Sequence, residues 1–204
     1  MIINDSSGVN RKERGINRAE VKNELAISLF ERKVEEGDSL GTCVFISHRS
    51  TDKDVAVDIA GYIRDCGIDV YIDVDDKGLQ IATINNDSES IVNYIHEGLK
   101  QSTHVLALIS DDTRDSWWVP YEIGYGEKAN KKIASMLLEQ DEVDFFPDYL
   151  KIVRRLYNTE DFIEFVKDLK RAQKVYGGIF ESEHPIILPD ISKVSKLIKE
   201  VNPN

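Results

Sequence analysis

The chain has 204 residues, enough for one domain of ordinary size with a hydrophobic core and too few for two full domains. Hydrophobic residues make up 41% and charged residues 31%, which is typical of a folded globular protein and not of a disordered one. The formal net charge of -11 argues against nucleic acid or an anionic membrane as partner, because surplus acid repels phosphate.

The amino-terminal residues lack the apolar run of a secretory signal, and no window approaches the roughly 18 apolar residues of a membrane span. We therefore expect a cytoplasmic protein. The first predicted element is a helix within residues 17–35, where Val21, Leu25 and Leu29 recur at helical spacing. The segment EEGDSLG that follows indicates a boundary, so residues 1–38 are predicted to form a helical extension.

From Cys43 onward, short apolar runs alternate with segments of helical periodicity. The runs CVFIS, DVYIDV, HVLALIS and KIASMLL are predicted strands, and YLKIVRRLY supplies a fifth. Because strands and helices alternate, we predict an α/β fold with a parallel sheet of five strands in the flavodoxin-like order 2-1-3-4-5. Cys43 and Cys66 are expected to be buried, reduced thiols.

Each predicted helix carries one apolar stripe. The first helix has Ser50, Thr51 or Asp52 as its N-cap and ends before Gly67, and the third begins at Trp118 with Pro120 in its first turn. The stripes consist of Val55, Ile59, Tyr62 and Ile63 in the first helix, Ile91, Ile95, Gly98 and Leu99 in the second, and Phe162, Phe165, Val166 and Leu169 in the closing helix. Residues 171–204 are a carboxyl-terminal extension, with a last helix predicted from Pro189 through Ile198.

Two polar loops are expected to meet at the carboxyl ends of the strands. In a sheet of this order, the connections after the first and third strands diverge and open a crevice there, where ligands bind. The first strand runs into SHRSTDKD and the third into SDDTRDSWWVPYE. A magnesium-binding phosphoacceptor receiver would place paired acids after its first strand; Ser47, His48 and Arg49 stand there, which argues against that class.

Three segments in sequence order resemble a TIR domain: VFISHRSTDKDVAVDIAGYIRDCGIDVYIDV, IVNYIHEGLKQSTHVLALIS and WWVPYEIGYG. The resemblance covers about residues 41–170 and is to bacterial TIR enzymes that cleave NAD, such as the stand-alone TIR component of Thoeris antiphage systems. The segment YIDVDDKGLQIATINNDSES falls where TIR domains have a long loop that covers the substrate and mediates TIR contacts. It lacks the proline of many animal signalling members, so adaptor-type contacts are not assumed.

The resemblance implies cleavage of NAD between ribose and nicotinamide, with NAD as substrate and with neither cofactor nor metal. The ribose carbon becomes cationic as the bond stretches, so a nearby carboxylate is the main requirement. Glu122 is the candidate catalytic residue, Trp118 one turn earlier would form an apolar wall, and Tyr125 continues that stripe. Outside the TIR context, Trp118 would be interpreted as a core anchor and Glu122 as a solvated helix position.

The segment after the first strand lines the NAD pocket in the family. Ser47 and Arg49 are therefore expected to contact phosphate or ribose, and His48 is either a base or a surface histidine. Asp73 or Asp75 either contacts a ribose hydroxyl or solvates its loop. No role is assigned to the other histidines, His96, His104 and His184.

Two classes of function follow. The first is an NAD glycohydrolase or ADP-ribosyl cyclase whose ADP-ribose product, cyclised or conjugated, is a signal in antiphage defence and is sensed by a separate effector protein. TIR self-assembly would accompany that activity. The second is a non-catalytic TIR interaction module, which the intact Glu122 disfavours. A more remote alternative is a nucleoside deoxyribosyltransferase, which shares the fold type and the use of glutamate on an N-glycoside.

Overall fold

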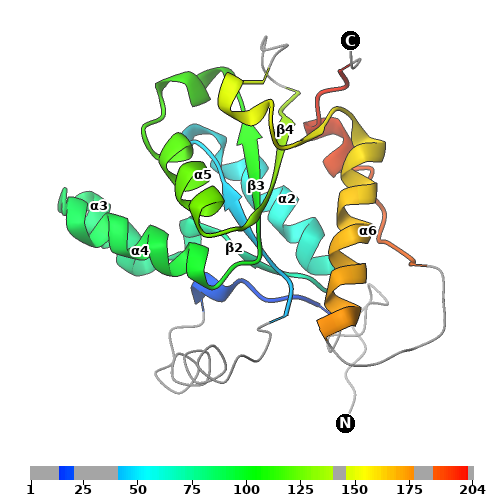
Figure 1. Cartoon of the computed structure of the whole chain (residues 1–204), viewed down its shortest axis with the longest axis horizontal. Coiled ribbons are helices and arrows are strands. Elements are labelled where there is room, and N and C mark those ends of the chain that lie inside the picture. Colours follow the sequence, from blue (N-terminus) through cyan, green and yellow to red (C-terminus); the bar gives the residue numbers. More distant parts are fainter. Residues whose placement is uncertain (1–13, 21–40, 140–145, 177–185, 202–204) are drawn as a thin grey trace.

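A five-stranded parallel sheet with the order β2-β1-β3-β4-β5 forms the centre of the protein, as predicted (Figure 1). The computed structural model describes residues 14–20, 41–139, 146–176 and 186–201. The strands are β1 (Cys43–Ser47), β2 (Asp69–Tyr71), β3 (His104–Ile109), β4 (Lys132–Leu137) and β5 (Arg154–Leu156). Every residue of β1 and β3 is buried, because helices cover both faces of the sheet.

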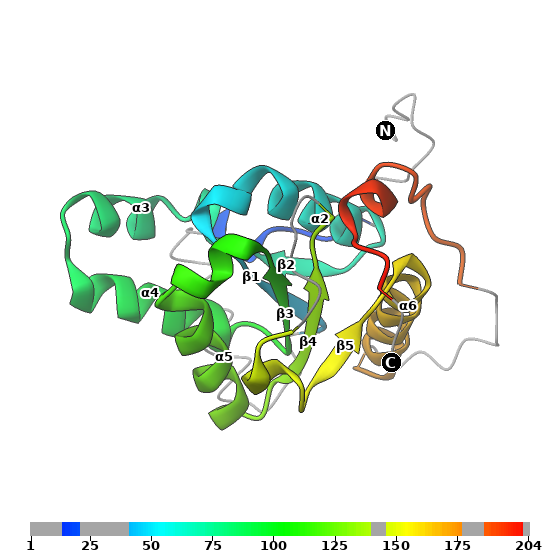
Figure 2. The same ribbon diagram turned by 90° about the horizontal axis from the view of Figure 1, so that it is seen from above.

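Among the described residues, the helices α2, α4, α5 and α6 form the two outer layers (Figure 2). Helices α2 (Lys53–Asp65) and α6 (Thr159–Tyr176) pack on one face, and α4 (Ser88–Lys100) and α5 (Trp118–Lys128) pack on the other. The predicted apolar stripes are the buried sides of these helices. Gly67 follows α2 with a φ of 78°, where a side chain would be strained, and Pro120 lies in the first turn of α5. Within the described ranges, no helix is long and apolar enough to cross a membrane.

The segment between β2 and α4 is more ordered than the predicted long loop. It contains a short 3-10 turn, η3 (Asp73–Asp75), and the helix α3 (Lys77–Ile84). The buried Asp76 begins α3, because its carboxylate accepts hydrogen bonds from the backbone N–H groups of Gly78 and Leu79 and from the Tyr71 hydroxyl at 2.7 Å. Leu79 and Ala82 bury one side of the helix. The loop prediction missed this cap and this stripe.

The prediction of a helix from residue 17 is wrong at its start. Asn17 forms a parallel bridge to Val70 in β2, and Arg18–Glu20 is a single 3-10 turn. The Arg18 side chain is buried, pairs with Asp69 at 2.9 Å and donates to the Gln101 carbonyl at 2.5 Å. Residues 21–38 of the proposed extension lie outside the described residues. At least residues 14–20 are thus packed against the edge of the sheet.

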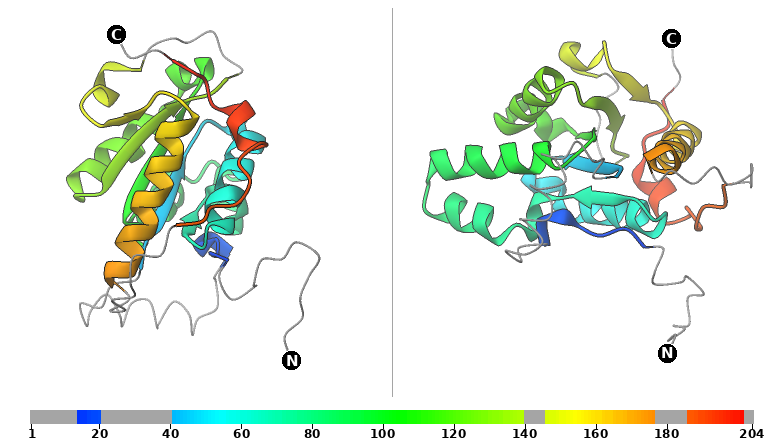
Figure 3. Two further views of the ribbon diagram at one scale, coloured as in Figure 1. Left: turned by 90° about the vertical axis from the view of Figure 1, so that its right-hand side faces the viewer. Right: turned by 60° about the horizontal axis from the view of Figure 1, so that its bottom comes forward.

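The predicted last helix from Pro189 to Ile198 is also wrong. The structure contains only the 3-10 turn η6 (Val194–Leu197), after which Ile198 pairs antiparallel with Leu138 at the end of β4. Backbone bonds from Glu139 N to Leu197 O and from Lys199 N to Leu137 O, both 3.0 Å, hold that pairing. The segment lies between α2 and α6 (Figure 3), where Val194 and Ile198 are buried in their common core. Pairing with the sheet satisfies backbone groups that a helix would have satisfied locally.

Candidate active site

The loops after β1 and β3 meet at the carboxyl ends of these strands, which confirms the predicted convergence. The Ser110 hydroxyl donates to Asp52 Oδ2 at 2.7 Å, and Arg49 Nη1 donates to the Asp115 carbonyl at 3.0 Å. The Arg49 Nε is buried and has no hydrogen-bond partner among the described residues.

Glu122 is a buried carboxyl group at the centre of this edge. It lies in the second turn of α5, is 6% exposed, and accepts a hydrogen bond of 2.6 Å from the Ser47 hydroxyl at the end of β1. Burial, reinforced by the negative charge of Asp73, raises the pKa of Glu122 well above its usual range, and the Ser47 hydrogen bond opposes this rise. The ionised carboxylate is therefore a high-energy group that a nearby positive charge would stabilise.

His48 and Asp73 form the second part of the site. His48 Nε2 lies 3.6 Å from Asp73 Oδ1, and His48 Nδ1 lies 3.2 Å from the Ile46 carbonyl, to which it must donate. Burial raises the pKa of Asp73 and His48 opposes the rise. Asp73 Oδ1 has no hydrogen-bond partner among the described residues. The site thus holds two carboxyl groups that both resist ionisation.

A cavity of about 350 Å³ adjoins His48 and Asp73, whereas Glu122 and Ser47 are not among the residues that line it. His48 and Asp73 line it from the sheet side, and Leu79, Gln80 and Thr83 line it from α3. Ser50 and Lys53, from the loop after β1 and the start of α2, complete the polar wall. Sequence reasoning missed the contributions of Lys53 and α3; the signal that could have found α3 was Asp76 before the stripe of Leu79 and Ala82.

The predicted aromatic wall does not line this cavity. Trp118 is 39% exposed and lies edge-on to Tyr121, with ring centroids 6.0 Å apart. Tyr125 stacks on His96 at 4.0 Å, and His96 Nε2 lies 2.7 Å from the Tyr121 hydroxyl. His96, to which no role was assigned, thus joins α4 to α5. The substrate contacts of Trp118 and Tyr125 stay predictions.

The remaining predicted site residues divide into two groups. The structure brings Ser47 to Glu122 and His48 to Asp73, and the side chain of Arg49, from the loop after β1, donates to a carbonyl of the loop after β3. The side chain of Asp75 lies outside the described part of the chain, as does His184, to which no role was assigned. Among the residues that the structure describes, no group of three His, Cys, Asp or Glu side chains could hold a metal ion.

Comparison with known proteins identifies three similarities. The family described as TIR domain matches residues 44–173. A Bacillus cereus protein named "Probable 3' cyclic ADP-D-ribose synthase ThsB'" is 26% identical over 102 residues, which is 50% of this chain and 51% of that protein, so the chain spans about half of that relative's length. The crystal structure of the TIR domain of the Toll-related receptor TRR-2 from Hydra magnipapillata is 14% identical, with a TM-score of 0.48, and the match covers 63% of this chain and 94% of that one.

Proposed function

The chain belongs to the TIR domain family through residues 44–173, and on that premise we propose that it cleaves NAD between the nicotinamide and the ribose. The observation that carries the proposal is the buried Glu122 carboxyl group, held by Ser47 at the carboxyl end of β1 and influenced by the charge of Asp73. Glu122 does not itself line the cavity beside His48 and Asp73, but a carboxyl group kept out of water and influenced by Asp73 is characteristic of a reacting site and not of a solvated helix turn.

The proposed reaction uses the positive charge that NAD carries on its nicotinamide ring. As the bond between ribose carbon and nicotinamide nitrogen breaks, its electron pair neutralises the ring, and the positive charge moves to the ribose. The Glu122 carboxylate stabilises that charge strongly, because the surroundings are dry and the group is already in place. The same positive charge lowers the free energy of the ionised carboxylate, so bound substrate favours the reactive form of Glu122.

Neighbouring residues take positioning and binding roles in this proposal. Ser47 orients Glu122, which differs from the phosphate or ribose contact predicted from sequence. The Lys53 ammonium, which lines the cavity, and the Arg49 guanidinium near it offer positive charge to the diphosphate, and the Asp73 carboxyl group, also in the lining, accepts from a ribose hydroxyl. Helix α3 covers the substrate and excludes water from the crevice.

We further propose that the ADP-ribosyl carbon is captured by a hydroxyl of the same molecule. A hydroxyl oxygen then bonds to the carbon that nicotinamide left, its proton passes to a base, and the product is cyclic. Support comes from the name of the Bacillus cereus relative, a cyclic ADP-ribose synthase. The proposed setting is the cytoplasm, where the product acts in antiphage defence on a separate effector and TIR self-assembly accompanies activity. NAD is the substrate, and no further cofactor enters the scheme.

The test is incubation of the purified full chain with NAD over a range of protein concentrations, since assembly can be required for activity. Free nicotinamide supports cleavage, and mass spectrometry of the remainder separates a cyclic product from ADP-ribose, which is heavier by one water. A parallel incubation with deoxynucleosides tests for free base, the mark of a deoxyribosyltransferase. If every concentration leaves NAD and deoxynucleosides intact, the proposal fails and an interaction module is the better description.

A further inference from the structure

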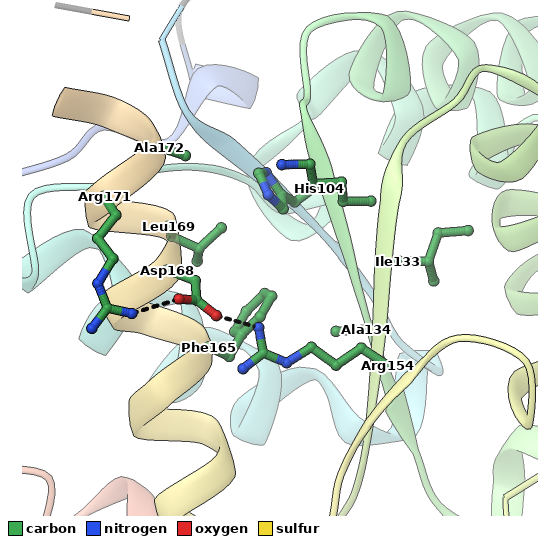
Figure 4. A pocket seen from close by; sticks show the side chains of 10 residues that line it. His104, Ile133, Ala134, Arg154, Phe165, Asp168, Leu169, Arg171 and Ala172 are labelled. Carbon is green, nitrogen blue, oxygen red and sulfur yellow. Dashed lines mark hydrogen bonds and ion pairs between the residues drawn. The ribbon is translucent and has the colours of Figure 1, made fainter. Parts of the chain in front are cut away.

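A second cavity, of about 580 Å³, lies at the opposite end of the sheet, against α6 (Figure 4). His104, Lys132 and Arg154 line it; they are the first residues of β3, β4 and β5. Asp168 and Arg171 of α6 form the facing wall. We call this space the amino-edge cavity. A six-residue strand such as β3 spans roughly 17 Å, so the amino-edge cavity is well separated from the Glu122 site.

The amino-edge cavity is a positively charged region in an acidic protein. Three cations, Lys132, Arg154 and Arg171, line it together with one acid, Asp168, although the whole chain carries a net charge of -11. Asp168 accepts from Arg154 Nη1 at 2.7 Å and from Arg171 Nη1 at 2.6 Å, and Figure 4 shows its carboxylate between the two guanidinium groups. Arg171 Nη1 also donates to Glu164 Oε1 at 2.7 Å, but Glu164 does not line the cavity, whose lining keeps three cations and one acid.

Two further polar groups at the amino-edge cavity can form hydrogen bonds to a ligand. The Lys132 ammonium has no hydrogen-bond or ion-pair partner within the described ranges. His104 is 8% exposed; its Nδ1 lies 2.8 Å from the Thr103 hydroxyl, and its Nε2 has no partner among the residues described. Burial, followed by the charges of Lys132 and Arg154, lowers the pKa of His104 to about 4, so the imidazole is neutral at pH 7.

The base of the amino-edge cavity is apolar. Phe165, Leu169 and Ala134 line it and are buried, and the Arg154 guanidinium lies over the Phe165 ring at 5.5 Å from its centroid. The volume of the cavity falls within the range of small-molecule sites, about 300–1,000 Å³, and exceeds what an inorganic anion needs. Apolar walls with a few convergent cations suit a molecule that has both an anionic and a planar apolar part.

We propose that the amino-edge cavity is a binding site for a small organic anion, in which a phosphate or carboxylate meets Lys132 and Arg171 and a planar group lies near Phe165. This site goes beyond the proposed cleavage of NAD and depends on none of the residues around Glu122. A ligand here would contact the amino ends of β4 and β5 and the second half of α6.

Phenyl phosphate is a suitable probe, since it joins a planar ring to a phosphate and does not resemble NAD. It would be titrated calorimetrically into the full chain, beside inorganic phosphate, which lacks the ring, and phenol, which lacks the charge. We expect saturable binding of phenyl phosphate with one site, and weaker binding of both comparators. Lys132→Gln and Arg171→Gln should each weaken phenyl phosphate binding about tenfold or more, as expected for the loss of a charge-assisted hydrogen bond.

Two matched variants lose the same charge elsewhere. Lys196→Gln removes an exposed cation from η6, near the other end of the sheet, and Lys53→Gln removes one from the cavity beside His48. Both should bind phenyl phosphate as the wild type does. The proposal is overturned if the wild type shows no saturable binding, if Lys132→Gln binds unchanged, or if only Lys53→Gln loses binding. Thermal melts accompany each variant; should Arg171→Gln unfold, Lys132→Gln decides, because it breaks no contact described above.

Discussion

Glu122 and Asp73, at the carboxyl ends of the strands, have few partners, whereas Arg18 and Lys131, at the amino ends, are held by a carboxylate and by carbonyls. Glu122 accepts one hydrogen bond, from Ser47, and Asp73 Oδ1 accepts none among the described residues. At the opposite edge, Arg18 is bound by Asp69 and the Gln101 carbonyl, and Lys131 donates to the Ser102 carbonyl at 2.7 Å. Carboxyl groups with few partners thus mark the edge of the candidate active site, and paired cations stabilise the other edge.

The direction of the helices accounts for this segregation. Each helix of a parallel α/β sheet runs back against the strands, so helix carboxyl ends, which favour cations, gather at the amino edge of the sheet. Arg64, Lys100 and Lys128 occupy the last turns of α2, α4 and α5. The Lys132 ammonium departs from this pattern, since it has no partner among the residues described, and it lines the amino-edge cavity. It is therefore the Lys132 ammonium, and not the general surplus of cations at this edge, that indicates a second binding site at the amino-edge cavity.

The largest expected effect comes from Glu122→Gln, which keeps the size of the side chain and removes its charge. If the carboxylate stabilises the cationic ribose, nicotinamide release should fall on the order of 100-fold or more, while NAD binding changes far less. Release is measured for wild type and variant under identical activating conditions, with NAD binding measured by calorimetry. A folded variant that cleaves NAD at the wild-type rate would remove Glu122 from the catalytic role.

Arg18→Ala tests the opposite edge, where charge is predicted to serve stability. The change leaves Asp69 without its buried partner and should lower the free energy of unfolding by about 2–3 kcal/mol. Arg14→Ala is the matched control, because Arg14 pairs with Asp65 in the open and should contribute under about 1 kcal/mol. Urea denaturation measures both. Equal losses of unfolding free energy would show that the buried Arg18 contributes no more to stability than the exposed Arg14.

Deletion of residues 1–38 removes Arg18 too, so cleavage of NAD should be measurable only where the shortened chain stays folded.

The stability of the wild type should fall in acid through His104. Its pKa in the folded protein is about 4, below the ordinary 6.5, so its contribution is complete above pH 6.5 and is lost as the pH falls towards 4. Between pH 7.5 and 4.5 this loss amounts to about 2 kcal/mol. The unfolding free energy of His104→Gln does not contain the contribution of a neutral imidazole. The difference in unfolding free energy between wild type and variant should therefore become smaller in acid. A gap independent of pH would contradict the assigned neutral imidazole.

The smallest effects are opposite shifts of the pH profile of cleavage. Activity should rise as Glu122 ionises, and Asp73→Asn removes a negative charge that raises the Glu122 pKa, which moves the profile to lower pH. Ser47→Ala removes the hydrogen bond that lowers the same pKa, which moves the profile to higher pH. The measurement is the pH dependence of kcat for nicotinamide release. If both variants move the pH profile in the same direction, the ionisation that the profile reports is not that of Glu122.

Stability against pH gives an independent measure of Glu122. Because its pKa is raised in the folded protein, its contribution to stability is complete below the ordinary value of 4.5 and is lost as the pH rises towards the folded value. Glu122→Gln removes this dependence and should therefore gain stability relative to wild type as the pH increases above 4.5. Thermal melts across that range measure the difference without any substrate.

Local pattern was enough to predict most of the fold. The alternation of apolar runs with helical stripes led to five parallel strands in the observed order, and the polar loops after β1 and β3 meet as expected. Both predictions rest on periodicities of two to four residues and on the chirality of crossovers, which neighbouring residues determine. The failed helix between Pro189 and Ile198 had the same periodicity, but pairing of Ile198 with Leu138 provided an alternative.

The sequence by itself therefore determined the parallel sheet and the buried stripes, since these follow from residue type and short spacing, whereas the candidate role of Glu122 came from the resemblance to TIR domains and stays a prediction. Only the tertiary structure decided what Glu122 contacts. Its partner Ser47 is 75 residues away, and Arg18 meets Asp69 across 51 residues. The amino-edge cavity likewise joins His104, Lys132 and Arg171, which no local pattern connects. Such groups come together only when helices pack on the sheet, because packing fixes which side chains lose water and which remain charged in each other's presence.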